Sequence, residues 1–420
     1  MENEFESILL VTDFYYPHPT SIGICIDKLV EEFKLMGKKV TIICYDNEIN
    51  KRNIVVNNVE IYFIKQKIGE RVKKIADKQK NKLFKILLNY LGIFLVRFGQ
   101  LLFFPWCRMS SIIVPLRYYF KINELYKKNK YDMICSSNAP FDGTLGTYWF
   151  KKKNPDVYWE CYILDTFSNK GQTKYISAKT NDKKGWKWEK KFFDKANKII
   201  NIKGDVEHYS KSRYDIYRKK MVNTDVPLFD LKHYEVIPKK NNEKIRMIYA
   251  GRLLEHLSSP QYLCELLYKL SKKIDYSMDF YSSGDCEKII EKYQNITSGK
   301  IKRCGLIDHN ELLERYKKAD ILISIGSKKA DLTPSKIFEY MSMGKKIIHI
   351  IKNDNDICVE SYKKYPKALL IDERDNVEEN IEKIIKFINS EDLQIDFNTL
   401  KEAFIENTPQ YTVELMLKIK

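Results

Sequence analysis

Segment 331–344, DLTPSKIFEYMSMG, carries the residue types best suited to chemistry. It follows an apolar run, ILISIG, and its own apolar residues have helical spacing after a proline, which predicts a strand, a loop and a helix start. The free backbone N–H groups of Ser335 and Lys336, with the helix dipole, favour a bound phosphate there. Glu339, one turn further, can accept hydrogen bonds from two vicinal ribose hydroxyls. An ordinary capped helix with a solvated glutamate fits the same pattern, so both interpretations stay open.

A second candidate is the run YAGRLL at 249–254, where a predicted strand ends at Gly251 and Arg252 follows directly. The planar fork of an arginine can hold two oxygens of a diphosphate. The alternative is a surface arginine in a turn. In the N-terminal half, the loop YPHPTSIG contains Gly23, which allows backbone amides to approach the same phosphates, and His18.

Two polar residues, Asn138 and Asp165, follow predicted strands of the N-terminal half, where an acceptor molecule would bind. Both types are also common in ordinary polar loops. We expect no metal site, because no DxD tripeptide follows a strand in a suitable setting and the histidines form no pair at metal spacing. The DND at 354–356 is typical of a solvated turn, and His349 is typical of a buried strand.

Alternating strands and helices must position these residues. An apolar strand at 7–12, helical spacing over 24–36 and the strand VTIIC predict a βαβ unit with a parallel sheet, and a second such series runs from about 244 to 350. The length of 420 residues and a hydrophobic content of 44% suit two α/β domains. A charged content of 31% argues against a polytopic membrane protein.

The stretch 226–242 has two prolines, a polar cluster and no sustained periodicity, so we place a hinge there. The predicted domains are residues 1–225 and 243–395, with a C-terminal helix at 396–420 that packs back on the N-terminal domain. Nine scattered cysteines without a CxxC pair predict reduced thiols, and the acidic start of the chain does not resemble a secretory signal. We therefore expect a cytoplasmic protein.

The net charge of +17 is concentrated in one block. Residues 51–130 hold 18 Lys and Arg against four acids, which gives 18 − 4 = +14. Within an insertion at about 70–125, residues 78–107 predict a basic amphipathic helix on an anionic membrane surface. A membrane-spanning helix and a buried core helix with one wet edge are the alternatives, and nucleic acid is not an expected partner. The residues that we assign to the membrane contact are Lys78, Lys82, Lys85, Arg97 and Trp106, with Asn89 and Gly92 on the stripe of the three lysines.

Four segments in order resemble the family 4 glycosyltransferases. They are TDFYYPHPTSIGICIDKLVEEFKLMGKKVTII, YAGRL, CGLIDHNELLERYKKADILISIG and PSKIFEYMSMGKKIIHI. The resemblance implies a GT-B fold, in which two doubly wound Rossmann-like domains face a cleft. It also implies an N-terminal acceptor-binding domain, a C-terminal nucleotide-sugar-binding domain, and retaining transfer from a nucleoside-diphosphate sugar without a metal or other cofactor.

The resemblance also implies roles for single residues. Gly23 and Gly251 would line the donor, Arg252 would neutralise the diphosphate, and the backbone of Ile307 would contact the base. The amides of Ser335 and Lys336 would bind the phosphates, and Glu339 the ribose. The chain departs from the family at Asp331, where a glutamate is usual and where the carboxylate would orient the transferred sugar, and at EHLSSP, which includes His256 where the family has a lysine and a glycine.

Two main hypotheses follow, and a nucleotide-binding oxidoreductase or epimerase is a third, weaker alternative, because no GxGxxG follows the first predicted strand. The first is a hexosyl- or N-acetylhexosaminyl-transferase, peripheral on the inner face of the cell membrane. It would act on a lipid-linked or cell-surface glycan acceptor in capsule, exopolysaccharide or related polysaccharide biosynthesis. The second, motivated by the two departures, is a catalytically inactive GT-B scaffold or partner subunit.

Overall fold

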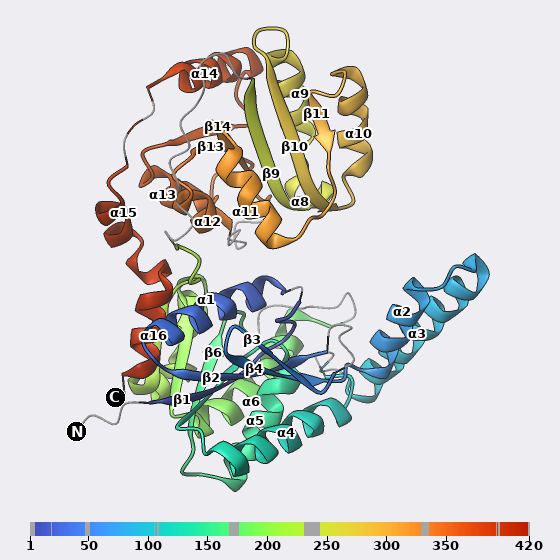
Figure 1. The fold of residues 1–420 in the computed structure, drawn as a ribbon, viewed down its shortest axis with the longest axis vertical. Helices are drawn as coiled ribbons and strands as arrows, with labels where there is room; N and C mark the ends of the chain where they lie inside the picture. Colours follow the sequence, from blue (N-terminus) through green and yellow to red (C-terminus); the bar gives the residue numbers. More distant parts are fainter. Residues whose placement is uncertain are drawn as a thin grey trace. The chain divides into compact units, whose positions relative to one another are not determined.

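The structure is a computed structural model, and it describes residues 5–17, 19–46, 51–104, 106, 109–167, 176–230, 244–328, 336–391, 393 and 395–418. The chain divides into two compact α/β units. The N-terminal unit comprises Met1–Pro227 and Pro409–Lys420, and the C-terminal unit comprises Leu228–Thr408. The alternation of strands and helices that the sequence predicts is present in both units (Figure 1).

The N-terminal unit is built on an eight-stranded sheet in the order β3-β4-β2-β1-β5-β6-β7-β8. Neighbouring strands are parallel, except that β3 pairs antiparallel with β4. Most of these strands are buried and mostly apolar because helices cover both faces of the sheet. The strands are β1 (Ser7–Val11), β2 (Lys39–Tyr45), β3 (Asn53–Val56), β4 (Val59–Ile64), β5 (Met133–Ser137), β6 (Tyr158–Ile163), β7 (Lys198–Ile202) and β8 (Met221–Thr224).

Helices α1 and α16 lie on one face of this sheet, and α4, α5 and α6 lie on the other (Figure 1). Aromatic and aliphatic side chains from the strands and from α4 to α6 form the core of that second face. The helices are α1 (Ser21–Leu35), α2 (Ile68–Asp77), α3 (Lys82–Leu102), α4 (Ile113–Asn129), α5 (Phe141–Lys153), α6 (Ala178–Lys195), α7 (Val206–Tyr209) and α16 (Pro409–Leu417), with 3-10 turns at Lys203–Asp205 and Ser212–Lys220.

The C-terminal unit has a six-stranded sheet, β11-β10-β9-β12-β13-β14, in which every neighbouring pair is parallel. Its strands are β9 (Ile245–Leu253), β10 (Tyr276–Gly284), β11 (Ile301–Arg303), β12 (Ile321–Ile325), β13 (Lys346–Ile351) and β14 (Ala368–Asp372). Its helices are α8 (Glu255–Ser258), α9 (Gln261–Leu270), α10 (Glu287–Ile296), α11 (His309–Lys318), α12 (Lys336–Ser342), α13 (Cys358–Lys363), α14 (Val377–Asn389) and α15 (Phe397–Ala403), followed by a 3-10 turn at Ile405–Asn407.

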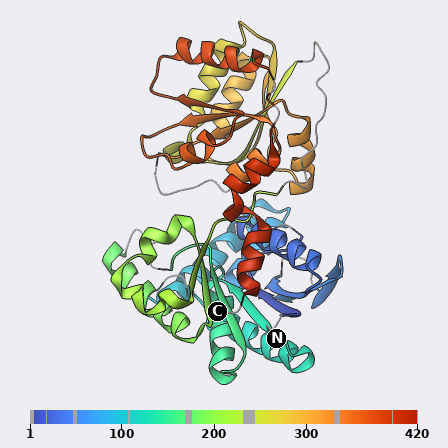
Figure 2. The ribbon, with the colours of Figure 1, turned by 90° about the vertical axis from the view of Figure 1, so that its left-hand side faces the viewer.

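The C-terminal end of the chain is shared between the units. Helix α15 belongs to the C-terminal unit, which extends to Thr408 rather than to 395, and only α16 returns to the N-terminal unit (Figure 2). The ammonium of Lys198 on β7 donates to the carbonyls of Leu415 at 2.8 Å and Met416 at 3.0 Å. The last helix is therefore fixed to the sheet by a buried cation.

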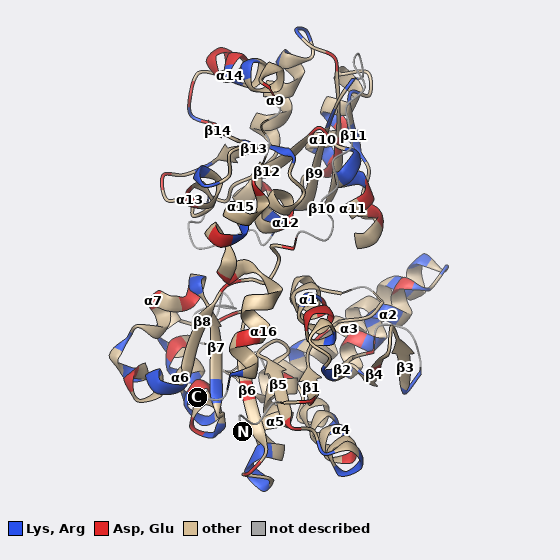
Figure 3. Cartoon of the chain, turned by 60° about the vertical axis from the view of Figure 1, so that its left-hand side comes forward, with Lys and Arg blue, Asp and Glu red and all other residues tan. Residues whose placement is uncertain are grey.

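The basic segment forms a helical hairpin rather than the single helix that we predicted (Figure 3). Lys78 caps the end of α2, and the side chain of Asn81 accepts from two backbone N–H groups at the start of α3. The helices approach closely at glycines, because a Cβ on Gly69 would lie 2.8 Å from the carbonyl oxygen of Gly92. Gly92 is therefore buried against α2, and Lys78 does not share a helix with Lys82.

Two further expectations for this segment change. Trp106 is only 5% exposed, and its ring packs on Phe141 with centroids 5.6 Å apart, so it belongs to the core and not to a membrane contact. Conversely, α3 is not a core helix with one wet edge, because only Gly92 and Gly99 of it are buried. Among the described residues, α3 is the one helix long and apolar enough to cross a membrane by length and composition.

Candidate functional site

The C-terminal unit has a pocket of about 270 Å³ where β9 and β12 end and α12 begins. It brings together Gly251, Arg252 and Lys336, which the sequence analysis selected from two separate segments. The remaining lining is mostly apolar, with a few hydroxyl groups. The carboxyl ends of parallel strands are where α/β folds bind ligands, so this is the candidate ligand site.

Tyr340 fixes the geometry of the pocket. Its ring is buried, and its phenolic oxygen accepts from the backbone N–H of Ala250 on β9 at 3.0 Å. Because Tyr340 lies one turn after Lys336, this contact holds the start of α12 against the end of β9. At Gly251 an added Cβ would lie 3.0 Å from the hydroxyl of Tyr249, so a glycine keeps the strand end open.

Lys336 supplies positive charge in a poorly solvated place. Burial lowers the pKa of its ammonium, and the nearby Glu339 carboxylate opposes that change only in part. An anion bound in the pocket would stabilise the protonated, charged form of Lys336, and the charged lysine would in turn strengthen binding of the anion. The lining therefore suits a phosphate group, with Arg252 as a second donor.

Glu339 has a partner that the sequence analysis missed. Its side chain is 12% exposed, and Oε1 lies 3.2 Å from Nε2 of His309, the first residue of α11. Ile307 lies just before α11, in a loop that Gly305 turns with a φ of +72°. His309 directly follows CGLID, a segment that the sequence analysis did consider. It was not selected because a single histidine at the start of a helix has no specific functional meaning.

In the N-terminal unit, Gly23 lies in the first turn of α1. Its N–H donates to Thr20 Oγ1 at 3.2 Å, and a Cβ would lie 2.3 Å from the carbonyl oxygen of Phe14. Packing of the β1–α1 loop on the helix therefore requires glycine here. Asn138 is buried, and its Oδ1 accepts from the N–H of Leu164 at 2.9 Å, while its amide donates to the Asp165 carbonyl. The Asn138 side chain thus braces the ends of β5 and β6.

Three of the candidate residues, His18, Asp331 and Ser335, lie outside the described residues. The structure places the other candidates in two groups, one in each unit. Gly251, Arg252 and Lys336 line one pocket of the C-terminal unit, with Glu339 on the same helix as Lys336.

No protein-family model and no curated protein sequence matches the chain. Solved structures do match over nearly its whole length. An α,α-trehalose-phosphate synthase (UDP-forming) from Burkholderia xenovorans has a TM-score of 0.55 at 8% identity, covering 97% of this chain and 99% of that one. A UDP-GlcNAc 2-epimerase from Methanocaldococcus jannaschii has a TM-score of 0.54 at 11% identity, covering 98% and 99%. The lipopolysaccharide outer core galactosyltransferase WaaB has 0.51 at 10%, covering 98% and 97%.

The fold is GT-B. At these identities the likeness establishes the fold alone, and the similar structures include both transferases and an epimerase. Because one fold can carry many activities, the GT-B fold does not fix the reaction. The residues of the pocket at the ends of β9 and β12 determine which activity this chain can support.

A buried network supports the wall of the GT-B pocket. His349 on β13 is fully buried, with Nδ1 2.9 Å from Ser324 Oγ and Nε2 3.0 Å from Asp356 Oδ2. Burial, the largest single influence, would raise the pKa of Asp356, but the hydrogen bond and electrostatic interaction with His349 together with hydrogen bonds from Cys358 outweigh it and lower that pKa. Our expectation that 354–356 is a solvated turn is wrong for Asp356, because its carboxylate holds the histidine that contacts the pocket-lining Ser324.

The same residues could be considered for a metal. One ligand atom each of His349, Asp356 and Cys358 lies within 4.8 Å of the others. Burial raises the pKa of the Cys358 thiol, which keeps it protonated, and His349 is already hydrogen-bonded at both nitrogens. A protonated thiol is a poor ligand, so the cluster fits a structural network better than a metal centre.

The sequence analysis also missed Asp13, which follows β1 at the carboxyl end of the GT-B N-terminal sheet. The hydroxyl of Thr20 donates to both of its carboxylate oxygens, at 2.7 and 2.9 Å. Burial nevertheless raises the pKa of Asp13 to about 7. A carboxyl group that titrates near neutral pH is suited to proton transfer, although one acid after a strand gives no such signal in the sequence.

We expect Asp13 to make stability depend on pH. The folded protein holds the Asp13 proton up to about pH 7, whereas the unfolded chain releases it near 3.8, so stability falls as pH rises between those values. The free energy of unfolding should therefore decrease by about 2 kcal/mol between pH 5 and pH 7 because of Asp13, since one pKa unit corresponds to about 1.36 kcal/mol. Asp13→Asn should remove this decrease. Urea unfolding of both proteins at several pH values measures the difference. Parallel stability curves would contradict the assignment.

Proposed function

We propose that the protein is a retaining glycosyltransferase that moves a hexosyl or N-acetylhexosaminyl group from a nucleoside-diphosphate sugar to a lipid-linked or cell-surface glycan acceptor. The observation that carries the proposal is the convergence of Gly251, Arg252 and Lys336 on one pocket of a GT-B unit. Similar structures named for UDP-linked chemistry make a uridine nucleotide the first donor to test.

In this proposal the protein accelerates departure of the nucleoside diphosphate. Charge develops on the diphosphate as the bond to the sugar breaks, and cations already in place stabilise that charge without reorganising. Arg252 would hold two phosphate oxygens with its fork, and Lys336 would add a point charge beside them. Glu339, which lies beside His309, would accept from the ribose, and Asp331 would orient the transferred sugar.

Nucleotide binding is the first expected result. A saturating nucleoside diphosphate at about 100 times its Kd should stabilise the protein by about 2.7 kcal/mol, which corresponds to roughly 5 to 10 °C in the melting temperature of a domain of this size. Glu339→Ala should weaken the affinity about tenfold or more, because hydrogen bonds to a charged group contribute about 1.5 to 3 kcal/mol. A thermal-shift screen of uridine, adenosine, guanosine and thymidine diphosphates measures both effects.

The matched control is Glu382→Ala, which removes an exposed carboxylate from α14 of the same unit. It should bind nucleotide like the wild type. If no nucleotide shifts the melting temperature, or if Glu339→Ala and Glu382→Ala behave alike, the proposed donor site is wrong. Tight nucleotide binding without hydrolysis or transfer of a labelled nucleotide sugar would instead support the inactive scaffold, which the aspartate at 331 favours.

We also propose that the protein works as a peripheral protein on the inner face of the cell membrane, in capsule, exopolysaccharide or related polysaccharide biosynthesis. The support is the outer surface of α3, where long apolar side chains are exposed. Soluble proteins rarely expose a large apolar patch to water, so such a patch indicates contact with a membrane or a partner. Leu83 is 80% exposed, and Leu87, Tyr90, Phe94, Leu101 and Leu102 are exposed as well. An interfacial helix of this kind buries its apolar face in lipid, with basic residues such as Lys82, Lys85 and Arg97 near anionic head groups.

A further inference from the structure

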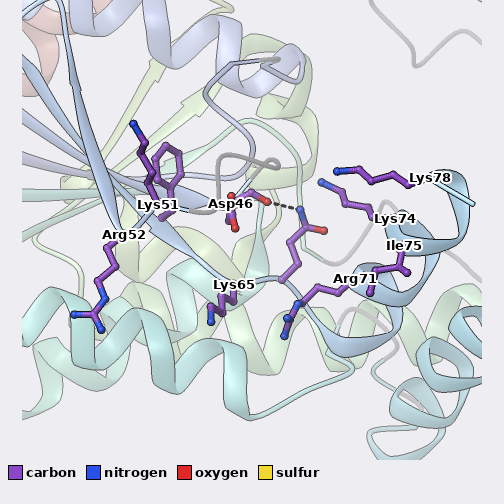
Figure 4. Close-up of a pocket in the computed structure, with 10 residues that line it drawn as sticks. Asp46, Lys51, Arg52, Lys65, Arg71, Lys74, Ile75 and Lys78 are labelled. Atoms are coloured by element: carbon purple, nitrogen blue, oxygen red, sulfur yellow. Dashed lines mark hydrogen bonds between the residues drawn. The ribbon is translucent and has the colours of Figure 1, made fainter.

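The N-terminal unit contains a second pocket, of about 480 Å³, that no part of the proposed transfer reaction uses. It lies between the ends of β2 and β4, the start of β3 and one side of α2 (Figure 4). Its volume is within the range of small-molecule sites. We call it the basic pocket, and its lining residues are Asp46, Lys51, Arg52, Phe63, Lys65, Gln66, Arg71, Lys74, Ile75 and Lys78.

The lining of the basic pocket has a large excess of positive charge. Six of its residues are lysine or arginine, and Asp46 is the only acid among them. Gln66 is buried, and its amide donates to the Asp46 backbone carbonyl at 2.6 Å, which fixes the floor between β2 and β4. Lys74 and Lys78 extend from α2 toward this floor (Figure 4). The cations thus come from three separate elements around one concavity.

Four of these cations have no counter-charge within the described part of the chain. Lys51, Arg52, Lys65 and Arg71 form no side-chain ion pair or hydrogen bond there, whereas Lys73 and Lys85 of the hairpin pair with Glu70 and Asp77. Like charges gathered around a pocket repel one another unless an anion joins them. A phosphate monoester or diphosphate, with about two negative charges in a compact group, matches this arrangement.

The position of the pocket indicates where that phosphate comes from. Helix α2 contributes Arg71, Lys74 and Lys78 to the basic pocket, and α2 also packs along α3, whose outer surface is apolar. The hairpin projects from the edge of its own sheet (Figure 1). A soluble anion would not need an apolar surface on the same hairpin, whereas a lipid offers phosphate and hydrocarbon together.

We propose that the basic pocket binds the phosphate of a membrane lipid that carries a phosphate monoester or diphosphate head group, while α3 lies in the adjoining hydrocarbon. The pocket thereby orients the N-terminal unit on the membrane. This proposal rests on the membrane association proposed above but not on sugar transfer. Its test therefore measures lipid binding without any nucleotide, and it can fail while nucleotide binding holds.

The test is sedimentation with phosphatidylcholine vesicles that contain either phosphatidic acid or enough phosphatidylglycerol to give the same surface charge. Wild-type protein should bind the phosphatidic acid vesicles at least about tenfold more tightly. Lys65→Gln/Arg71→Gln should lose about 10- to 30-fold on these vesicles, because each basic residue near an anionic surface contributes about 1 kcal/mol. Both side chains are exposed, so the melting temperature should not change.

The matched control is Lys127→Gln/Lys128→Gln, which removes two exposed charges from the end of α4 in the same unit. It should lose less than about threefold. Leu83→Glu/Leu87→Glu, on the exposed surface of α3, should abolish binding to both kinds of vesicle. Equal binding of the two vesicle types by the wild type, or equal losses in the two charge variants, would show diffuse attraction and overturn the proposal. Stabilisation by inorganic phosphate without preference for phosphatidic acid would also overturn it, because the pocket would then be a site for a soluble anion.

Discussion

Replacing Arg252 by alanine is expected to lower kcat for sugar transfer by about 100- to 1000-fold and to leave the fold intact. Arg252 lies in the last residues of β9 and lines the pocket, where it would face the departing diphosphate. Removing one donor that stabilises developing charge typically costs that much in rate. The side chain is exposed to the pocket and not part of the core, so the melting temperature should stay within about 2 °C of the wild type.

The experiment measures kcat for sugar transfer by Arg252→Ala, Arg252→Lys and Arg246→Ala. The donor is the nucleotide sugar of the nucleotide that binds best in the thermal-shift screen. Arg252→Lys keeps the charge but loses the fork, so it should recover only part of the rate. Arg246→Ala, at the start of the same strand, is the matched control and should transfer sugar at close to the wild-type rate. An Arg252→Ala protein with more than a third of the wild-type kcat would remove Arg252 from the mechanism and leave Lys336 as the main phosphate ligand.

The sheets could be predicted from the sequence because parallel strands are buried on both faces. Runs such as VTIIC in β2 and ILISI in β12 are short and mostly apolar, as expected of strands buried on both faces. The pocket residues could be selected from the sequence because each lies at the end of a predicted element. Gly251 and Arg252 lie at the end of a strand, and Lys336 lies at the start of a helix. The position of a residue at the start or end of a helix or strand depends on its neighbours in the sequence, so it can be predicted without the tertiary structure.

Contacts between distant segments could not be predicted in this way. Asp356 follows a strand in a polar turn sequence, and only its pairing with His349 shows that it is buried. The lysines at 78, 82 and 85 keep helical spacing across the turn between α2 and α3, because a count of residues does not detect a change of direction. The cap at Asn81 and the close glycines at 69 and 92 were the available signals, and each is too common alone to decide between one helix and two.

The burial of Trp106 has the same origin. A tryptophan beside a phenylalanine pair fits a membrane interface and a protein core equally well by composition. Its contact with Phe141, the first residue of α5, decides for the core. The apolar side chains on the outer surface of α3 differ because they are exposed in the described N-terminal unit, which is why the membrane proposal now rests on the helix and not on the tryptophan.

The second large effect is expected at Lys198, which is 2% exposed and lies 3.1 Å from the fully buried Glu160. Burial raises the pKa of Glu160 to about 7 even though Lys198 opposes the change. Lys198→Met would leave that carboxyl group buried without a cation, and would leave the carbonyls of Leu415 and Met416 without their donor. Breaking a buried pair in this way costs about 3 to 5 kcal/mol.

Urea unfolding measures this loss, and proteolysis shows whether α16 becomes accessible at the same time. The double variant Glu160→Leu/Lys198→Met should recover part of the stability, because it removes the unpaired buried carboxyl group and leaves only the carbonyls unsatisfied. Lys195→Met, an exposed position at the end of α6, is the control and should change stability by less than about 0.5 kcal/mol. If the double variant were no more stable than Lys198→Met, the contacts with α16 rather than the ion pair would account for the loss, and the C-terminal helix would be the element that Lys198 stabilises.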